Sequence, residues 1–152
     1  MTIADFIEIN TTSIVADADG RITKRHLQHY EDSTPGVVTS RVATLLRLAI
    51  KSVRERRLDA MEKYMDQVAN ERHNAGFEIR EVQSAINAIE EAIWKLVMQK
   101  RDPAVQVEDL GLVGTVFGAA KDALARRYAS FAGASVALQM SNTASDTDLQ
   151  PR

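Results

Sequence analysis

Apolar residues recur at intervals of three and four along residues 77–100, and this spacing limits what the chain can fold into. Residues three and four apart share one face of an α-helix, so the segment is expected to form an amphipathic helix with one buried side. The positions on that face are Ile79, Val82, Ile86, Ile89, Ile93, Leu96 and Val97. At 1.5 Å per residue such a helix is about 35 Å long, which is enough to cross a domain. The segment therefore predicts the central helix of a helical protein.

Several other segments share this spacing, and no part of the sequence alternates apolar and polar residues with the period of two that a half-buried strand requires. The chain therefore predicts an all-α bundle of about five to six helices. We expect long helices over residues 3–16, 37–56, 58–74, 77–100 and 107–134, with a weaker helical segment over 22–30.

Short breaks are expected between these helices. The sequence DADG at 17–20 is expected to end the first helix, and Gly76 to close a hairpin between the two helices that flank it. The sequence SNTASDTDLQPR at 141–152 has the composition of a disordered end or a linker. The predicted organisation is thus a helical domain over residues 1–133, followed by a polar C-terminal tail or linker over residues 134–152.

Length and composition narrow the classes of protein to which the chain can belong. A chain of 152 residues fits one domain, and the lack of cysteine excludes disulfides, thiolate nucleophiles and thiolate-bound metals. The 19 basic and 21 acidic residues give a net charge of −2, so no strong field favours a nucleic-acid or membrane partner. The longest nearly apolar run, at 110–120, is shorter than the ~20 residues of a membrane span. These features predict a soluble, cytoplasmic protein.

His73 is a candidate haem ligand, because haem-binding globins are all-α proteins in which a helix presents one histidine to the iron. At 100° per residue, His73 lies roughly 100° from the apolar stripe formed by Met61, Met65 and Val68, so it is expected on the flank of its helix. A haem ligand should instead point into a deep apolar pocket. We therefore expect no cofactor, and a haem- or tetrapyrrole-binding sensor that uses His73 is the alternative.

No group of side chains predicts catalysis or metal binding. His26 and His29 stand three apart, as zinc ligands can, but in a charged stretch where solvated side chains are expected. The sequence contains no phosphate-binding loop and no paired nucleophile and base. Solvated helix faces are expected for the carboxylates around the hairpin, which are Glu71, Glu78, Glu81, Glu90 and Glu91. The chain is therefore predicted not to be an enzyme.

Two residues of the hairpin break its amphipathic pattern. Arg72 falls on the apolar stripe, four residues after Val68, and we expect it to extend to solvent at the helix end or to pair with a facing carboxylate. The alternative is that Arg72 holds an anionic ligand or partner. Trp94 lies roughly 100° from the main stripe of its helix and faces a second surface. We favour packing of Trp94 within the chain over contact with another subunit.

The last helix carries glycines, which disfavour a helix. Gly111, Gly114 and Gly118 each cost about 1 kcal/mol relative to alanine in a helix interior. With neighbouring alanines they form a smooth face that a second helix can approach closely. That second helix belongs either to the same chain or to a dimer mate.

The stretch ERHNAGFEIREVQSAINAIEEAIWKLV, residues 71–97, resembles the central signature of the N-terminal sensor domain of RsbR-type stressosome co-antagonists. The features that carry the resemblance are the turn Gly76-Phe77, the pair Glu81-Val82, and an acidic and aliphatic run up to Trp94. The flanking helices are compatible in length and order, so the resemblance covers about residues 3–133.

The resemblance implies a globin-like all-α fold without haem, a homodimer, and a non-enzymatic sensor module in bacterial stress signalling. In that family a helical linker joins the sensor domain to an output domain such as a STAS domain or a kinase, so a regulatory protein of this type is the expected partner. This chain departs from the pattern by stopping at Arg152 with no output domain. The expectation is therefore a stand-alone relative or a fragment of a longer sensor, and the downstream partner and the signal stay open.

Overall fold

The computed structural model describes residues 1–148, which form seven helices and no strand. The helices are α1 (Ile3–Ile9), α2 (Thr11–Lys24), α3 (Gln28–Glu31), α4 (Pro35–Glu55), α5 (Asp59–Asn74), α6 (Ile79–Lys100) and α7 (Pro103–Asp148). The predicted all-α class is confirmed. Residues 149–152, the last part of the predicted tail, lie outside the described residues.

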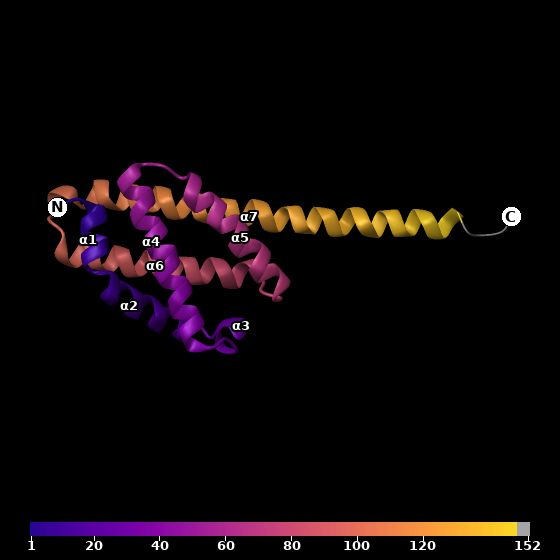
Figure 1. Cartoon of the computed structure of the whole chain (residues 1–152), viewed down its shortest axis with the longest axis horizontal. Coiled ribbons are helices and arrows are strands. Elements are labelled where there is room, and N and C mark those ends of the chain that lie inside the picture. Colours follow the sequence, from indigo (N-terminus) through magenta and orange to yellow (C-terminus); the bar gives the residue numbers. More distant parts are fainter. Residues whose placement is uncertain (149–152) are drawn as a thin grey trace.

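Helix α6 lies at the centre of the body. Figure 1 shows α6 and the first half of α7 running antiparallel, because only a short turn joins them, and α7 then projects from the body. Helix α2 packs on α6, α5 packs along α7, and α4 crosses the bundle to contact α1, α2, α5 and α7. Across residues 1–148, no helix combines the length and the apolar character needed to cross a membrane.

The core is built from the apolar faces that the spacing predicts. On α6, the predicted face is buried from Val82 to Val97, and Ile79 at its start is half-buried. Complete burial of a large aliphatic or aromatic side chain contributes about 1.5–3 kcal/mol to folding. The large apolar side chains with almost no exposed surface are Ile7, Ile14, Leu46, Met61, Met65, Ile93, Phe117 and Leu124. They come from six of the seven helices, so one continuous core holds the body together.

The N-terminal region differs from the expected single helix over 3–16. Two helices meet at Asn10, whose side-chain Nδ2 donates to the Phe6 carbonyl at 2.8 Å, and the Thr11 hydroxyl donates to the Glu8 carbonyl at 2.9 Å. Such side chains compete with the backbone for nearby carbonyl groups, and they bend or end helices. The division at Asn10 follows from this competition.

The expected break at 17–20 is wrong, because α2 continues through Gly20. Arg21 donates from Nε to the Asp17 carboxylate at 3.2 Å, one turn earlier, and Ile22 is buried against the core. Burial of one face of a helix outweighs the weak helix propensity of aspartate and glycine.

Helix α7 is longer than expected at both ends. The sequence predicts a helix over 107–134, and the expectation of disorder is wrong for residues 141–148, which are helical. Phe131 is the last residue packed against the core, and residues 132–143 are exposed. The proposed domain boundary after residue 133 remains a prediction.

A buried ion pair fixes the corner between α6 and α7. Arg101 donates to the two carboxylate oxygens of Asp109, at 2.7 Å from Nε and 3.3 Å from Nη2. Arg101 also donates from Nη1 to the Met1 carbonyl at 3.0 Å, and its guanidinium carbon lies 5.4 Å from the ring centre of Phe6. The side chains of Arg101 and Asp109 are only 12% and 6% exposed. The pair therefore joins the start of the chain to the turn that orients α7.

Candidate functional site

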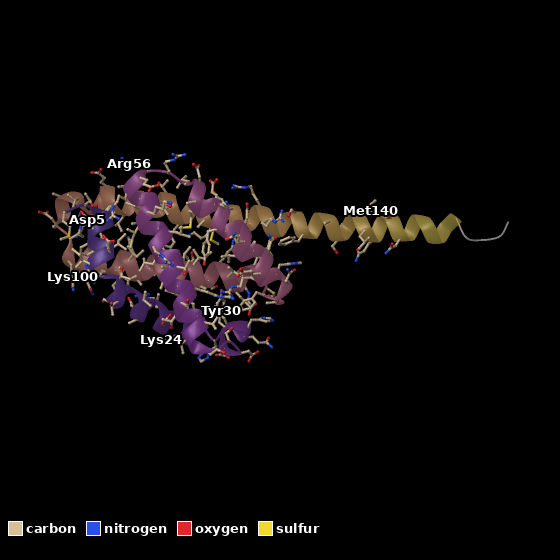
Figure 2. The ribbon with its side chains drawn as sticks, viewed as in Figure 1. Asp5, Lys24, Tyr30, Arg56, Lys100 and Met140 are labelled. Carbon is tan, nitrogen blue, oxygen red and sulfur yellow. The ribbon has the colours of Figure 1, made fainter. Side chains whose placement is uncertain are left out.

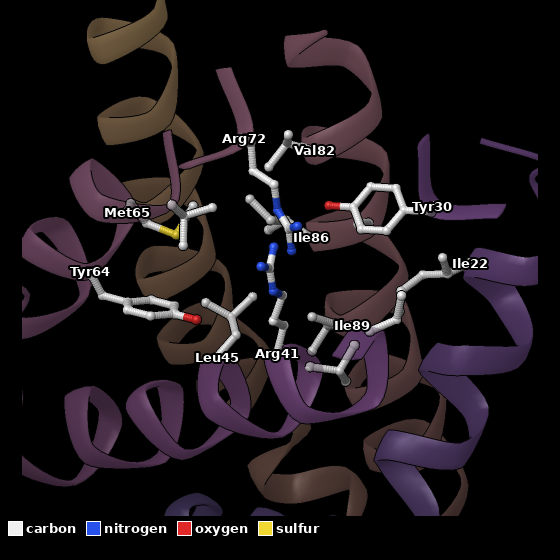
Figure 3. A pocket seen from close by; sticks show the side chains of 14 residues that line it. Ile22, Tyr30, Arg41, Leu45, Tyr64, Met65, Arg72, Val82, Ile86 and Ile89 are labelled. Carbon is white, nitrogen blue, oxygen red and sulfur yellow. The ribbon is translucent and has the colours of Figure 1, made fainter. Parts of the chain in front are cut away.

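A cavity of about 50 Å³ lies between the hairpin of α5 and α6 and the helices α2, α3 and α4. Four polar side chains line it, namely those of Tyr30, Arg41, Tyr64 and Arg72. Figure 3 shows the guanidinium groups of Arg41 and Arg72 pointing toward each other, with the hydroxyls of Tyr30 and Tyr64 directed inward from opposite sides. The rest of the wall is apolar and includes Ile22, Val42, Leu45, Met65, Val82 and Ile86.

Arg72 lies inside the protein, so the expectation that it extends to solvent is wrong. Only 7% of the residue is exposed, and its guanidinium carbon lies 5.3 Å from the ring centre of Tyr30 and 4.9 Å from that of Phe77. Its Nε atom is buried without a hydrogen-bond partner, and within residues 1–148 its side chain forms no ion pair, so the expected pairing with a facing carboxylate is also wrong. Arg72 is therefore a buried cation whose charge, within the described residues, is contacted by aromatic rings and by no carboxylate.

Arg41 is a residue of this site that the sequence reasoning misses. It stands three residues after Val38 and four before Leu45, so it interrupts the apolar face of α4. This interruption is the signal that could have identified it. Arg41 is half-buried, and in the part of the chain that the structure describes its side chain makes no hydrogen bond or ion pair. Two like charges thus face one cavity without a counter-charge.

The two tyrosines of the cavity remain protonated at neutral pH. Burial raises the pKa of Tyr30 far above its ordinary value, and burial also raises the pKa of Tyr64. The positive charge of Arg41 lowers both pKa values but does not offset the effect of burial. A neutral phenol can donate a hydrogen bond to an anion. The cavity therefore presents two cations and two hydroxyl donors, and none of the described residues that line it is acidic.

Glu81 is buried beside this site, so the expectation that it lies on a solvated face is wrong. It is 4% exposed and forms a capping box with Glu78 at the start of α6, accepting from the Glu78 backbone N–H at 2.9 Å. It also accepts from His29, at 3.2 Å from the backbone N–H and 2.8 Å from Nδ1. His29 is half-buried rather than solvated, whereas His26 is exposed as expected. Within residues 1–148, no three or more acidic or histidine side chains cluster as metal ligands would.

Replacement of Glu81 by glutamine is expected to lower the free energy of unfolding by about 2 kcal/mol at pH 7, because charge-assisted hydrogen bonds to a buried carboxylate are lost. Burial raises the pKa of Glu81, but the hydrogen bonds from His29 and from the Glu78 backbone outweigh burial, so the net pKa lies below its ordinary value. A lowered folded-state pKa adds stability above the unfolded value of about 4.3, and this stability is lost as the pH falls through the folded pKa.

Urea unfolding of the wild type and Glu81→Gln at several pH values checks this prediction. The difference in stability should be largest near pH 7 and should shrink below about pH 4. Glu71→Gln, at an exposed position of α5, is the control and should change stability by less than about 0.5 kcal/mol. A difference that does not change with pH would contradict the assigned role of the carboxylate charge.

His73 lies on the exposed seam between α5 and α7. Its ring stacks on Phe131 with 4.2 Å between centres and meets the edge of Tyr128 at 5.7 Å. It does not line the cavity. The position of His73 therefore adds nothing in favour of the haem-binding alternative, which remains an untested prediction.

Trp94 does not pack inside the chain, so the interpretation we favoured from the sequence is wrong. It is 54% exposed, and Met98, one turn along the same face of α6, is exposed as well. Trp94 and Gly114 line one shallow depression between α6 and α7. Apart from the adjacent residues and nearby backbone of α7 itself, no described atom lies within 4 Å of a Cβ placed on Gly111, Gly114 or Gly118. Within residues 1–148, therefore, no second helix of the same chain uses the smooth face that these glycines form.

This smooth face continues along α7. Its members fall within an arc of about 100° around the helix, in which Asp122 is the one charged residue and Thr115 carries a hydroxyl. The apolar members and glycines are Val107, Gly111, Gly114, Gly118, Ala125, Ala129, Ala132, Gly133, Val136 and Met140. Val107 is 84% exposed, and Met140 stands free on the projecting part of the helix in Figure 2. We call these residues, together with Trp94 and Met98, the α6–α7 face.

Comparison with protein-family models, with curated proteins and with solved structures finds no match to this chain. The resemblance to the RsbR-type sensor domain, including its globin-like fold, therefore remains a prediction. The structure places Arg72 at the cavity, and Trp94 and the three glycines on the α6–α7 face.

Proposed function

We propose that this protein is a non-enzymatic regulatory module that acts as a homodimer through the α6–α7 face. The observation that carries the proposal is the exposed, largely apolar surface of α7, which extends from the body into the projecting part with Asp122 as its one charged residue. An exposed apolar surface of this length marks an interaction site in a monomeric unit. From Val107 to Met140 it spans about 50 Å.

The chemistry of the face favours a second copy of α7 as its occupant. Each of the three glycines weakens the helix by about 1 kcal/mol, and within residues 1–148 nothing packs against them to offset this cost. Glycines on a helix permit the close approach of another helix. A helix that projects alone into water is marginally stable, so pairing with the partner's α7 supports both copies along the same face.

We also propose, on the resemblance of residues 71–97, that the module belongs to a cytoplasmic signalling pathway of the bacterial stress response. In this proposal the helical body receives a signal, a change in helix packing follows, and α7 passes this change to a STAS-domain or kinase-type partner. The described helices support such a route, because α5 borders the cavity and packs along α7.

Light scattering after size-exclusion chromatography tests the dimer. We expect a dimer at tens of micromolar for the full chain and at least a tenfold weaker dimer for Gly114→Glu, which places a charge on the part of the face beside Trp94. A Cβ at Gly114 clashes with no atom of residues 1–148, since nothing beyond the adjacent part of its own helix lies within 4 Å of it, so the variant should fold and keep its helical circular dichroism.

Ser130→Glu is the matched control, because it adds the same charge at an exposed position of α7 about 160° away from Gly114. It should leave the dimer unchanged. Trp94 is the only tryptophan, so its fluorescence should shift to shorter wavelengths as the concentration rises through the dissociation constant. A strict monomer at tens of micromolar, or equal weakening by both variants, would contradict the proposal.

A further inference from the structure

We propose that the cavity between Arg41 and Arg72 binds a compact oxyanion, the carboxylate or phosphate group of a small molecule. The role of this site as the input of the regulatory module rests on the proposed function, whereas binding of the anion does not depend on dimerisation. The proposal starts from Arg72, which is 93% buried, points into the cavity, and has an Nε atom without a partner.

The two positive charges that line the cavity favour the binding of an anion. A buried cation is unfavourable unless a counter-charge or hydrogen bonds accompany it. The rings of Tyr30 and Phe77 provide cation–π contacts to Arg72, but they satisfy none of its N–H donors. Arg41 adds a second positive charge directed at the first. An anion between the two guanidinium groups would remove their repulsion and accept hydrogen bonds from both.

The donors fit an oxyanion better than a spherical ion. A guanidinium group presents parallel N–H donors that match two oxygens of one carboxylate or phosphate. The hydroxyls of Tyr30 and Tyr64 point into the same space from the sides and can donate to the remaining lone pairs. Two planar forks and two hydroxyls thus converge on one small group.

The size of the cavity limits the anionic group. Its volume is about 50 Å³, and one water occupies roughly 10–15 Å³ on this scale, so the space suits a group of about three to five heavy atoms. A second cavity of about 340 Å³ shares Ile22, Tyr30 and Val38 with the first and provides room for the rest of a ligand. Asp19 and Glu31 line that second cavity. Their negative charges disfavour a ligand that carries a further anionic group.

Binding at this site would act on two helices at once. Arg41 belongs to α4 and Arg72 to α5, so a shared anion would hold these helices together at the cavity. Helix α5 packs along α7. An anion bound in the cavity could therefore shift the packing that positions α7, which gives the module an input and a path to its projecting helix.

Thermal unfolding and isothermal titration calorimetry of the full chain test the proposal at pH 7. Sodium acetate and sodium phosphate are the probes, and sodium chloride keeps the ionic strength constant and serves as the reference. At ten times its dissociation constant, a bound anion should raise the unfolding midpoint by about 3–6 °C. Stabilisation by acetate alone identifies a carboxylate site, and stabilisation by phosphate alone identifies a phosphate site.

Arg72→Met and Arg41→Met should each weaken binding at least tenfold. Arg47→Met is the matched control, because Arg47 is exposed on the same helix as Arg41, and it should bind like the wild type. The proposal fails if neither oxyanion stabilises the protein more than chloride does, or if Arg72→Met responds like the wild type. A monomer in the light-scattering experiment would overturn the proposed dimer and leave this result unaffected.

Discussion

Arg72→Met is expected to raise the free energy of unfolding of the protein by about 1–3 kcal/mol when no anion is added. Most substitutions of a buried residue destabilise a protein. Here the native side chain is a cation that is 93% buried, has an unpaired Nε atom, and faces the like charge of Arg41. Methionine has a similar length and no charge, so it can fill the same space without these costs.

The expected change in the free energy of unfolding of Arg72→Met is the balance of opposing effects. Replacement of a buried ionic group by a well-packed apolar one often stabilises a protein by about 1–4 kcal/mol, and an unpaired buried donor costs about 1–3 kcal/mol. The cation–π contacts of Arg72 with Tyr30 and Phe77 offset part of this, at about 0.5–2 kcal/mol each. The net effect should remain stabilising because neither ring accepts the N–H groups.

Urea unfolding at pH 7 in a buffer without carboxylate or phosphate measures this difference. Arg47→Met removes an exposed arginine from α4 and should change stability by less than about 0.5 kcal/mol. A destabilised Arg72→Met protein would show that Arg72 is a structural part of the core. In that case the cation–π contacts of Arg72 with Tyr30 and Phe77 would outweigh the cost of burying its charge.

Asp109→Asn is expected to have the largest effect in the opposite direction, a loss of about 3–5 kcal/mol. Removal of one partner of a buried ion pair leaves the other as an uncompensated buried charge. Arg101 would keep its bond to the Met1 carbonyl and its contact with Phe6, but it would lose its only ion pair within residues 1–148. The corner between α6 and α7 should therefore loosen together with α1.

Thermal unfolding followed by circular dichroism checks the size of this loss, which should lower the midpoint by roughly 6–20 °C for a chain of this length. Asp66→Asn, at an exposed position of α5 away from this corner, should leave the midpoint within about 2 °C of the wild type. Equal midpoints for Asp109→Asn and Asp66→Asn would contradict the structural role of the Arg101–Asp109 pair.

Local spacing is sufficient to predict the helical class and much of the core. The apolar residues of α6 were expected on one face because a helix brings residues three and four apart together, and from Val82 to Val97 that face is buried. The division at Asn10 could not be predicted in the same way. It depends on side-chain hydrogen bonds to carbonyls of the preceding turn, which a pattern of apolar residues does not register.

At the candidate site, the spacing of residues does not predict which polar side chains are buried. Spacing correctly marks Arg72 as a polar residue on an apolar stripe. Its burial depends on Phe77, just across the Gly76 turn, and also on Tyr30, which comes from a distant segment of the chain. Glu81 is buried for a similar reason, since His29 comes from a segment 52 positions away. Trp94 is exposed because, among the helices of residues 1–148, none covers that side of α6, and only the tertiary arrangement reveals this.

Helix α7 is continuous from the body to Asp148, and proline occurs in it only at its first residue, Pro103. Each residue of an α-helix adds about 1.5 Å and about 100° of rotation. A continuous helix therefore keeps a fixed rotational phase between Phe117 in the core and Met140 outside it. If α7 rotates about its own axis inside the body, the end of the helix outside the body rotates by the same angle. Insertion of a single residue between Phe117 and Met140 would instead rotate the outer end relative to the core by about 100°.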